Sequence, residues 1–215
     1  MRQVTPLLLV LILLSAGCGS GVAFQPRLTE KSVLVVDQWV DTSPLVVMVR
    51  PKRSAMREHS ALFIPFRVEQ DISDVRHHGR ELMRVFWSDW TSKSLFPTMV
   101  YDDTLYYRSP EEAVRLARLK GADLAVTGVV TYLLHGGSYA DTAVSLRLEV
   151  YDAVTGYLVW SMEQAGRMEA NTVEDYILFA RKTRLPMDPM YAVLTSISDG
   201  MAQPVLQWSG LVSRP

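Results

Sequence analysis

Three consecutive segments within residues 123–162 restrict the fold of this chain more than any other part of it. Residues 123–134 are apolar at both odd and even positions, which is expected of a central strand covered on both faces. Apolar and polar residues alternate over 144–151 and again over 158–162, as in half-buried antiparallel strands. The loop at 152–156 ends in glycine, which is typical of a hairpin. Together these segments predict a three-strand antiparallel meander.

A helix with clear signals at both ends precedes the meander. Ser109 stands at the N-cap position, Pro110 at the first helical position and Glu112 three residues after the cap, so the segment forms a capping box. Gly121 is suited to close the same helix. We therefore expect a helix between Ser109 and Gly121.

Further elements are predicted upstream of this helix. Residues 60–66 are a short apolar run that fits a buried strand ending at Pro65. Asp74 is a suitable N-cap for a helix that continues to about Ser92, with apolar residues at helical spacing. A second short strand is expected at residues 96–101.

The remaining segments complete the plan. A late helix is expected to begin near Asp188-Pro189 and to end before Pro204, and residues 172–183 are read as another helix. Two apolar stretches, 32–40 and 45–50, are interpreted as an added hairpin.

The resulting order is strand, helix, strand, helix, three strands, helix. It predicts an α+β fold in which helices pack on one mixed sheet that contains the antiparallel meander. Because nearly half of the residues are apolar, residues 32–215 have enough material for one core, and we expect a single domain there.

The N-terminus has the layout of a secretory signal peptide over residues 1–17. A single positive charge at Arg2 is followed by an apolar run from Leu7 to Leu14, which is too short to span a bilayer as a helix. The next four residues, Ser-Ala-Gly-Cys at 15–18, resemble a bacterial lipobox. Cleavage is therefore predicted between Gly17 and Cys18.

Cys18 is the only cysteine among 215 residues, so one chain cannot form an internal disulfide. Its thiol is expected to carry a diacylglyceryl group and its amino group an N-acyl chain such as palmitate; the alternative is an ordinary signal peptide with an incidental cysteine. Gly19 and Ser20 follow, where lipoproteins kept at the inner membrane often carry Asp. The resemblance thus implies an anchor in the outer membrane, on its periplasmic face, with residues 18–31 as a tether.

Charge excludes one class of partner. One of the 22 basic residues, Arg2, lies in the signal peptide, so 21 remain against 23 acidic residues. A balance this close to neutral gives no basis for nucleic-acid binding.

Residues 109–167 carry a resemblance to a known superfamily. They contain a helix, Gly121-Ala-Asp, an apolar strand with Thr127-Gly128, and a hairpin with Asp152, Thr155-Gly156 and Trp160. The combination is similar to a superfamily of envelope proteins that includes the lipoproteins CsgG, PelC and LpoB and the amino-terminal domain of TolB. This resemblance implies no catalysis; it implies ring assembly or a protein-binding module.

Three functions follow as hypotheses. The first is a non-catalytic, oligomeric assembly component in the export or biogenesis of a cell-surface structure, with other envelope proteins as partners. The alternative is a monomeric lipoprotein regulator that binds an envelope enzyme such as a peptidoglycan synthase. The third is a carbohydrate-processing enzyme that uses Asp102 or Asp103 beside neighbouring tyrosines; we expect instead that these residues form a loop and that the chain is not an enzyme.

Metal and cofactor sites are not expected. The adjacent histidines His77 and His78 point about 100° apart on a helix, so they do not converge on one ion. No Gly-x-Ser-x-Gly elbow is present, and Gly136-Gly137 is read as a turn and not as a phosphate loop.

Exposed aromatic residues are the remaining clue to function. Tyrosine is enriched at protein interfaces because it buries a large area at low entropic cost. The candidate interface residues are Tyr101, Tyr106, Tyr107 and Tyr139. The alternative is that they line the rim of the core.

Overall fold

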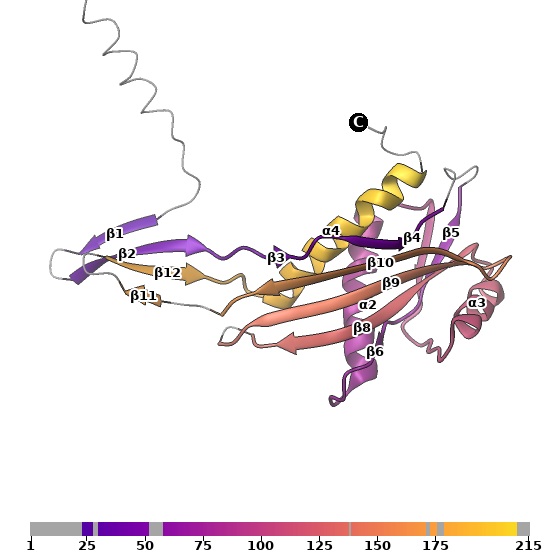
Figure 1. The fold of residues 1–215 in the computed structure, drawn as a ribbon, viewed down its shortest axis with the longest axis horizontal. Helices are drawn as coiled ribbons and strands as arrows, with labels where there is room; N and C mark the ends of the chain where they lie inside the picture. Colours follow the sequence, from indigo (N-terminus) through magenta and orange to yellow (C-terminus); the bar gives the residue numbers. More distant parts are fainter. Residues whose placement is uncertain are drawn as a thin grey trace, which may run out of the picture. The chain divides into compact units, whose positions relative to one another are not determined.

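The computed structural model describes residues 23–209, apart from 28–29, 52–57, 138, 171–172 and 176–178. The chain forms two compact units (Figure 1). Unit 1 contains the chain up to Gln38 together with residues 171–184, and unit 2 contains residues 39–170 together with the chain from Leu185 onward. This division differs from the single domain predicted over 32–215.

Unit 1 is a four-stranded sheet in the order β1-β2-β12-β11. Its strands are β1 (Ala23–Arg27), β2 (Glu30–Asp37), β11 (Val173–Asp175) and β12 (Phe179–Arg184). β2 pairs antiparallel with β1 and parallel with β12. Where β2 and β12 end, Arg184 Nε donates to the Asp37 carboxylate over 2.6 Å. This hydrogen bond lowers the pKa of Asp37.

Two predictions fail in unit 1. Residues 23–27 form β1 in a segment predicted to be a tether, and Pro26 is tolerated there because β1 is an edge strand whose register shifts between Gln25 and Arg27. Residues 172–183 were expected to be helical, but β11 and β12 lie there. Parallel pairing with β2, far away in sequence, overrides the local pattern.

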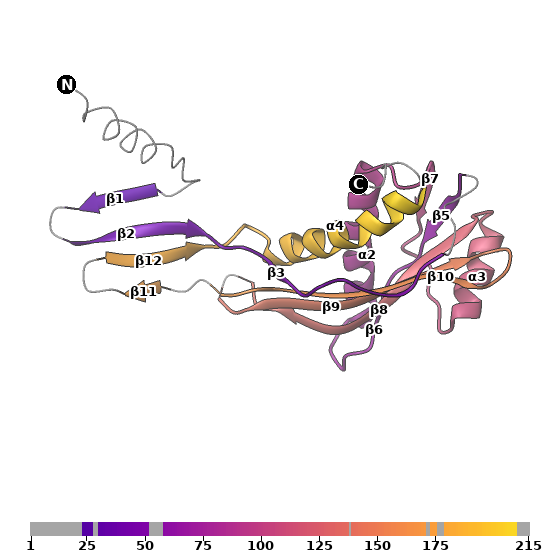
Figure 2. The same cartoon turned by 45° about the horizontal axis from the view of Figure 1, so that its top comes forward.

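Unit 2 is built on an eight-stranded mixed sheet in the order β3-β10-β9-β8-β5-β7, in which β4 also pairs with β10 and β6 with β8 (Figures 1 and 2). The strands are β3 (Asp41–Thr42), β4 (Val46–Val49), β5 (Ser60–Phe63), β6 (Arg67–Val68), β7 (Thr98–Tyr101), β8 (Leu124–His135), β9 (Thr142–Asp152) and β10 (Leu158–Met168). β8, β9 and β10 are the predicted antiparallel meander. The α+β fold class is confirmed.

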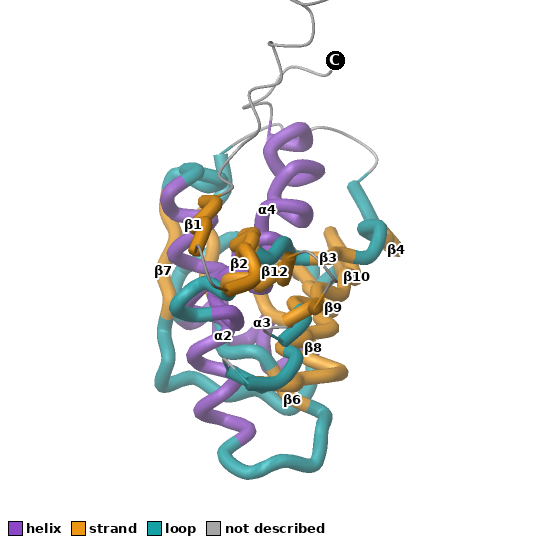
Figure 3. The backbone as a smooth tube through the Cα atoms, turned by 90° about the vertical axis from the view of Figure 1, so that its left-hand side faces the viewer, coloured by secondary structure: helices purple, strands orange, loops and turns teal. Residues whose placement is uncertain are grey.

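Helices cover both faces of this sheet. α2 (Val75–Ser92) and α4 (Pro189–Ser209) contribute to one hydrophobic core, while α3 (Pro110–Leu119) contributes to a second core. β5 serves both, since Phe63 belongs to the first core and Leu62 to the second. α4 runs alongside β9 and β10, and α2 crosses the strands (Figures 2 and 3).

The ends of α3 are as predicted. Ser109 Oγ accepts a hydrogen bond from the Glu112 N–H over 3.4 Å, and the Glu112 carboxylate accepts one from the Arg108 N–H over 2.9 Å. Gly121 adopts a φ of 70° just past the helix, which favours glycine. The Ser109 cap is therefore present, and the return bond of Glu112 reaches the residue before the cap, Arg108, instead of Ser109 itself.

The other two helices differ in detail from their predictions. Asp74 does precede α2, but it has a φ of 54° and its side chain makes no capping hydrogen bond. α4 continues through Pro204 instead of ending before it. A proline inside a helix costs about 3 kcal/mol. Here Val205 is fully buried beyond it and the Trp208 ring lies 6.2 Å from that of Trp160, which offsets the cost.

The hairpin predicted over residues 32–50 is not formed. β2 belongs to the sheet of unit 1, whereas β3 and β4 both pair with β10 in unit 2. The two stretches therefore do not pair with each other: β2 pairs with β1 and with the remote β12, and β3 and β4 pair with the remote β10. Among the described residues, no helix is both long and apolar enough to cross a membrane.

A close approach of α2 to the chain after β5 fixes this helix on the sheet. The Phe66 N–H donates to the Gly79 carbonyl over 3.2 Å, and a Cβ at Gly79 would lie 2.1 Å from the Phe66 oxygen. Gly79 costs the helix intrinsic stability. It is needed because no side chain fits between the two backbones.

We predict that Gly79→Ala destabilises the protein, although alanine is the better helix former. The added methyl must push Phe66 away, and overpacking of this kind costs about 1–3 kcal/mol. Urea denaturation followed by tryptophan fluorescence measures the change. Ser88→Ala, at an exposed position of the same helix, is the control and should be neutral or slightly stabilising. A Gly79→Ala protein as stable as this control would contradict the packing argument.

Candidate functional site

β4 is an apolar edge of the unit 2 sheet that no other described strand covers. It pairs with β10 on one side, and no other described strand pairs with its outer side. Val46, Val47 and Met48 are all exposed, Val46 to 54% and Met48 to 49%. Edge strands usually carry charges or prolines that block pairing. Here Pro44 and Pro51 stand only outside the strand, so no proline within β4 blocks pairing, and among the described residues its outer backbone groups have no partner strand.

β7 forms the opposite end of the same sheet. It pairs in parallel with β5 alone among the described strands, and Val100 is exposed on it. Tyr101, the last residue of β7, is half-buried; its hydroxyl donates to the Arg80 carbonyl over 2.7 Å, and its ring lies 5.9 Å from that of Trp87. Burial raises the pKa of Tyr101 above its usual range. The sheet thus has two different edges with exposed valines.

The four candidate interface tyrosines do not form one surface. Tyr139 is 96% exposed in the turn between β8 and β9, whereas Tyr106 is 45% exposed in the loop between β7 and α3. The guanidinium of Arg76 lies 4.6 Å from the centre of the Tyr106 ring. Tyr101 and Tyr106 are therefore near α2, while Tyr139 belongs to a separate hairpin.

Tyr107 departs from the expected exposure, because it is only 2% exposed and lies in the second core. Its hydroxyl donates to the Gly128 carbonyl over 2.8 Å and accepts from the Gly128 N–H over 3.2 Å. β5 pairs with β8 up to Val126 and β6 resumes at Val129, so the phenol fills the gap between them. Burial raises its pKa. The Tyr107 hydroxyl thus provides Gly128 with the donor and the acceptor that the backbone of a continuous neighbouring strand would otherwise provide.

Asp102 and Asp103 lie in the loop between β7 and α3. The Asp102 carboxylate pairs with Lys120 over 2.8 Å and accepts two hydrogen bonds from Thr104. The hydrogen bond from Lys120 is the main reason that the pKa of Asp102 is lowered. These contacts hold the loop in place, which is the interpretation preferred from the sequence.

Three of the histidines line one cavity of about 580 Å³ together with Trp87 and Tyr191. His77 and His78 come from α2 and His135 from the end of β8. The part of the chain that the structure describes contains no group of three or more His, Cys, Asp or Glu residues placed to hold a metal ion. Gly17 and Cys18, the predicted cleavage and lipid-attachment residues, lie outside the described residues.

No protein-family model matches the sequence, and no curated protein matches it either. Among solved structures, a PelC dodecamer from Paraburkholderia phytofirmans is 14% identical, with 78% of this chain and 97% of that chain covered and a TM-score of 0.48. Lipoprotein GNA1162 from Neisseria meningitidis is 18% identical, with 56% and 90% covered and a TM-score of 0.41. The C-terminal domain of LpoB from Salmonella enterica is 13% identical, with 53% and 87% covered and a TM-score of 0.32.

PelC and LpoB are two of the proteins that the sequence resembles. At these identities the similarity concerns the fold alone.

The β4 edge was not among the candidate sites predicted from the sequence. Its signal is the apolar run Val46-Val47-Met48-Val49 directly after Pro44. That run is equally expected of a buried strand, and only the sheet order shows that nothing described covers it.

We predict that Tyr107→Phe lowers the free energy of unfolding by about 1–3 kcal/mol, because it leaves the buried Gly128 N–H and carbonyl without a partner. Tyr106→Phe is the matched control and should be near neutral, since the ring over which Arg76 lies is kept. Chemical denaturation of both variants measures the difference. Equal stability of the two would contradict the assigned role.

The same tyrosine predicts a pH dependence. Because burial raises its pKa in the folded state, the unfolded chain loses this proton first. Its contribution to stability is therefore complete below about pH 10, the ordinary tyrosine pKa, and is lost as pH rises further. We expect wild-type stability to fall above pH 10 more steeply than that of Tyr107→Phe; parallel curves would contradict this.

Proposed function

We propose that this chain is a non-catalytic, lipid-anchored envelope protein that assembles into oligomers through the edges of its unit 2 sheet and serves the export or biogenesis of a cell-surface structure. The observation that carries the proposal is the apolar β4 strand, whose outer edge no described strand covers. An exposed strand of this kind is a template for pairing with another chain. The lipobox at residues 15–18 and the resemblance of residues 109–167 support the cellular setting.

The partner in this contact is a second copy of the same chain. β4 and β7 stand at opposite ends of one sheet, and both present exposed valines, Val47 and Val100. A contact between unlike edges of successive copies is heterologous, and such contacts generate rings when the rotation between copies closes. The near-neutral charge of the chain does not oppose self-association.

Oligomeric state tests the proposal directly. We expect the protein produced without residues 1–18 to sediment as an oligomer, and Val47→Lys to dissociate it, because the ammonium group would be buried without a partner. Val154→Lys makes the same change at another exposed valine, in the hairpin between β9 and β10, and should leave the mass unchanged. A wild-type domain that is strictly monomeric at high concentration would instead favour a regulator of an envelope enzyme.

Mixing variants separates unlike-edge from like-edge contacts. Val100→Lys should also be monomeric, but a mixture of the Val47→Lys and Val100→Lys chains retains one intact edge of each kind and should form dimers. A Val100→Lys chain that assembles like the wild type would rule out β7 as the second edge.

The lipid anchor has its own test. Because Cys18 is the only cysteine, Cys18→Ser should abolish incorporation of labelled palmitate and leave an uncleaved, longer chain. The wild type should carry the label and fractionate with the outer membrane. A Cys18→Ser chain that is cleaved normally would show that residues 1–17 are an ordinary signal peptide.

A further inference from the structure

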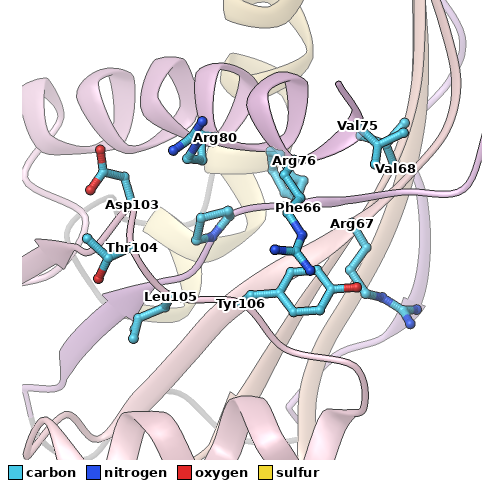
Figure 4. A pocket seen from close by; sticks show the side chains of 11 residues that line it. Phe66, Arg67, Val68, Val75, Arg76, Arg80, Asp103, Thr104, Leu105 and Tyr106 are labelled. Carbon is cyan, nitrogen blue, oxygen red and sulfur yellow. The ribbon is translucent and has the colours of Figure 1, made fainter. Parts of the chain in front are cut away.

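A second feature of unit 2 is a small pocket between α2, the chain around Pro65 and the loop before α3 (Figure 4). Its volume is about 250 Å³. Pockets for drug-sized ligands usually hold roughly 300–1,000 Å³, so this one suits a single compact group. Its walls combine arginine side chains with apolar and aromatic ones and with Asp103 and Thr104, as Figure 4 shows.

Positive charge is concentrated at this pocket. Arg76 and Arg80 lie one turn apart on α2, both are exposed, and neither forms an ion pair within the described part of the chain. Two like charges at this spacing repel each other. Arg84, one turn further along, is paired with Glu81. The two pocket arginines are therefore left without the neutralising partner that their neighbour has.

Arg67 adds a third guanidinium from β6. One of its terminal nitrogens donates to the Arg108 carbonyl over 3.1 Å, and another lies 3.6 Å from Glu69. Its Nε atom is buried and has no hydrogen-bond partner among the described residues. The first turn of α2 also carries no acidic residue, and the Asp74 side chain does not cap it. The three guanidinium groups and the N-terminus of α2, which no side chain caps, all favour the binding of an anion.

The rest of the lining selects among anions. Tyr106 places its ring beneath the Arg76 guanidinium, 4.6 Å from ring centre to charge, which holds both side chains in place. In Figure 4, Asp103 and Thr104 lie at the end of the pocket nearer Arg80, away from Arg76 and Tyr106. The Thr104 hydroxyl donates to Asp102, so its own oxygen remains able to accept a hydrogen bond. A carboxylate at Asp103 disfavours a phosphate dianion but accepts hydrogen bonds from hydroxyl groups.

We propose that this pocket binds an anionic sugar unit of the uronic acid class. The sugar carboxylate is held by Arg76 and Arg80, its hydroxyl groups donate to Asp103 and Thr104, and its apolar face packs against Tyr106. The site recognises one acidic sugar, either free or within a polymer. This assignment is independent of the sheet-edge contact, since no lining residue belongs to β4 or β7.

Isothermal titration of the full-length chain in a nonionic detergent tests the site. The ligands are glucuronate, a galacturonate oligosaccharide, glucose and inorganic phosphate. We expect glucuronate to bind at least about tenfold more tightly than glucose, the scale of a charge-assisted hydrogen bond. An oligosaccharide that binds more tightly per molecule than glucuronate identifies a polymer as the source, and equal binding identifies the free sugar. Equal affinity for phosphate and glucuronate would overturn the proposal.

Matched variants locate the binding. Arg76→Gln should weaken glucuronate binding about tenfold, and Arg76→Gln combined with Arg80→Gln by more, whereas Arg84→Gln, which like Arg76→Gln removes one charge from the same helix but lies outside this pocket, should leave it within about twofold. Tyr106→Ala gives an independent measurement without a change of charge and should also weaken binding. Equal effects of the Arg76 and Arg84 changes, or an unaffected Tyr106→Ala protein, would overturn the assignment. Urea denaturation of each variant confirms that it folds.

Discussion

Pro65 interrupts the hydrogen-bond ladder along β8, and the arrangement of unit 2 depends on how that interruption is accommodated. On one side, the Tyr107 hydroxyl satisfies both backbone groups of Gly128. On the other, Phe66 turns toward α2 and bonds to Gly79. The first contact joins the loop before α3 to the sheet, and the second joins α2 to it. A break in one strand thus determines where two helices pack.

The same interruption creates the pocket. Pro65 and Phe66 form one of its walls, and Arg67 enters it from the point where pairing with β8 resumes. α2 supplies Arg76 and Arg80 only because Gly79 lets this helix approach the chain so closely. By contrast, the β4 edge owes nothing to this region, since its position is set by pairing with β10. Unit 2 therefore carries two surfaces with separate structural origins, one apolar and one basic.

Elements with local signals were predictable from the sequence. The capping residues Ser109 and Glu112 and the alternation along β9 identify α3 and the meander because each signal lies within the element itself. β12 carries no comparable signal, since what makes it a strand is pairing of residues such as Lys182 with Val35 of β2. The prediction that α4 ends before Pro204 was wrong for a similar reason. Burial of Val205 against residues distant in sequence outweighs the cost of a proline within the helix. The candidate tyrosines show the same limit, because residue type alone does not distinguish the buried Tyr107 from the exposed Tyr139.

The parallel pairing of β2 with β12 bears on the order of folding. A chain that emerges N-terminus first can form the β1–β2 hairpin early, but the third strand of that sheet arrives only after residues 39–170. Contacts this distant in sequence form late, because loop-closure entropy opposes them until the intervening segment is compact. Unit 1 is therefore expected to close after the unit 2 meander has formed. Until then β2 presents an open edge to any chaperone or neighbouring chain that meets it.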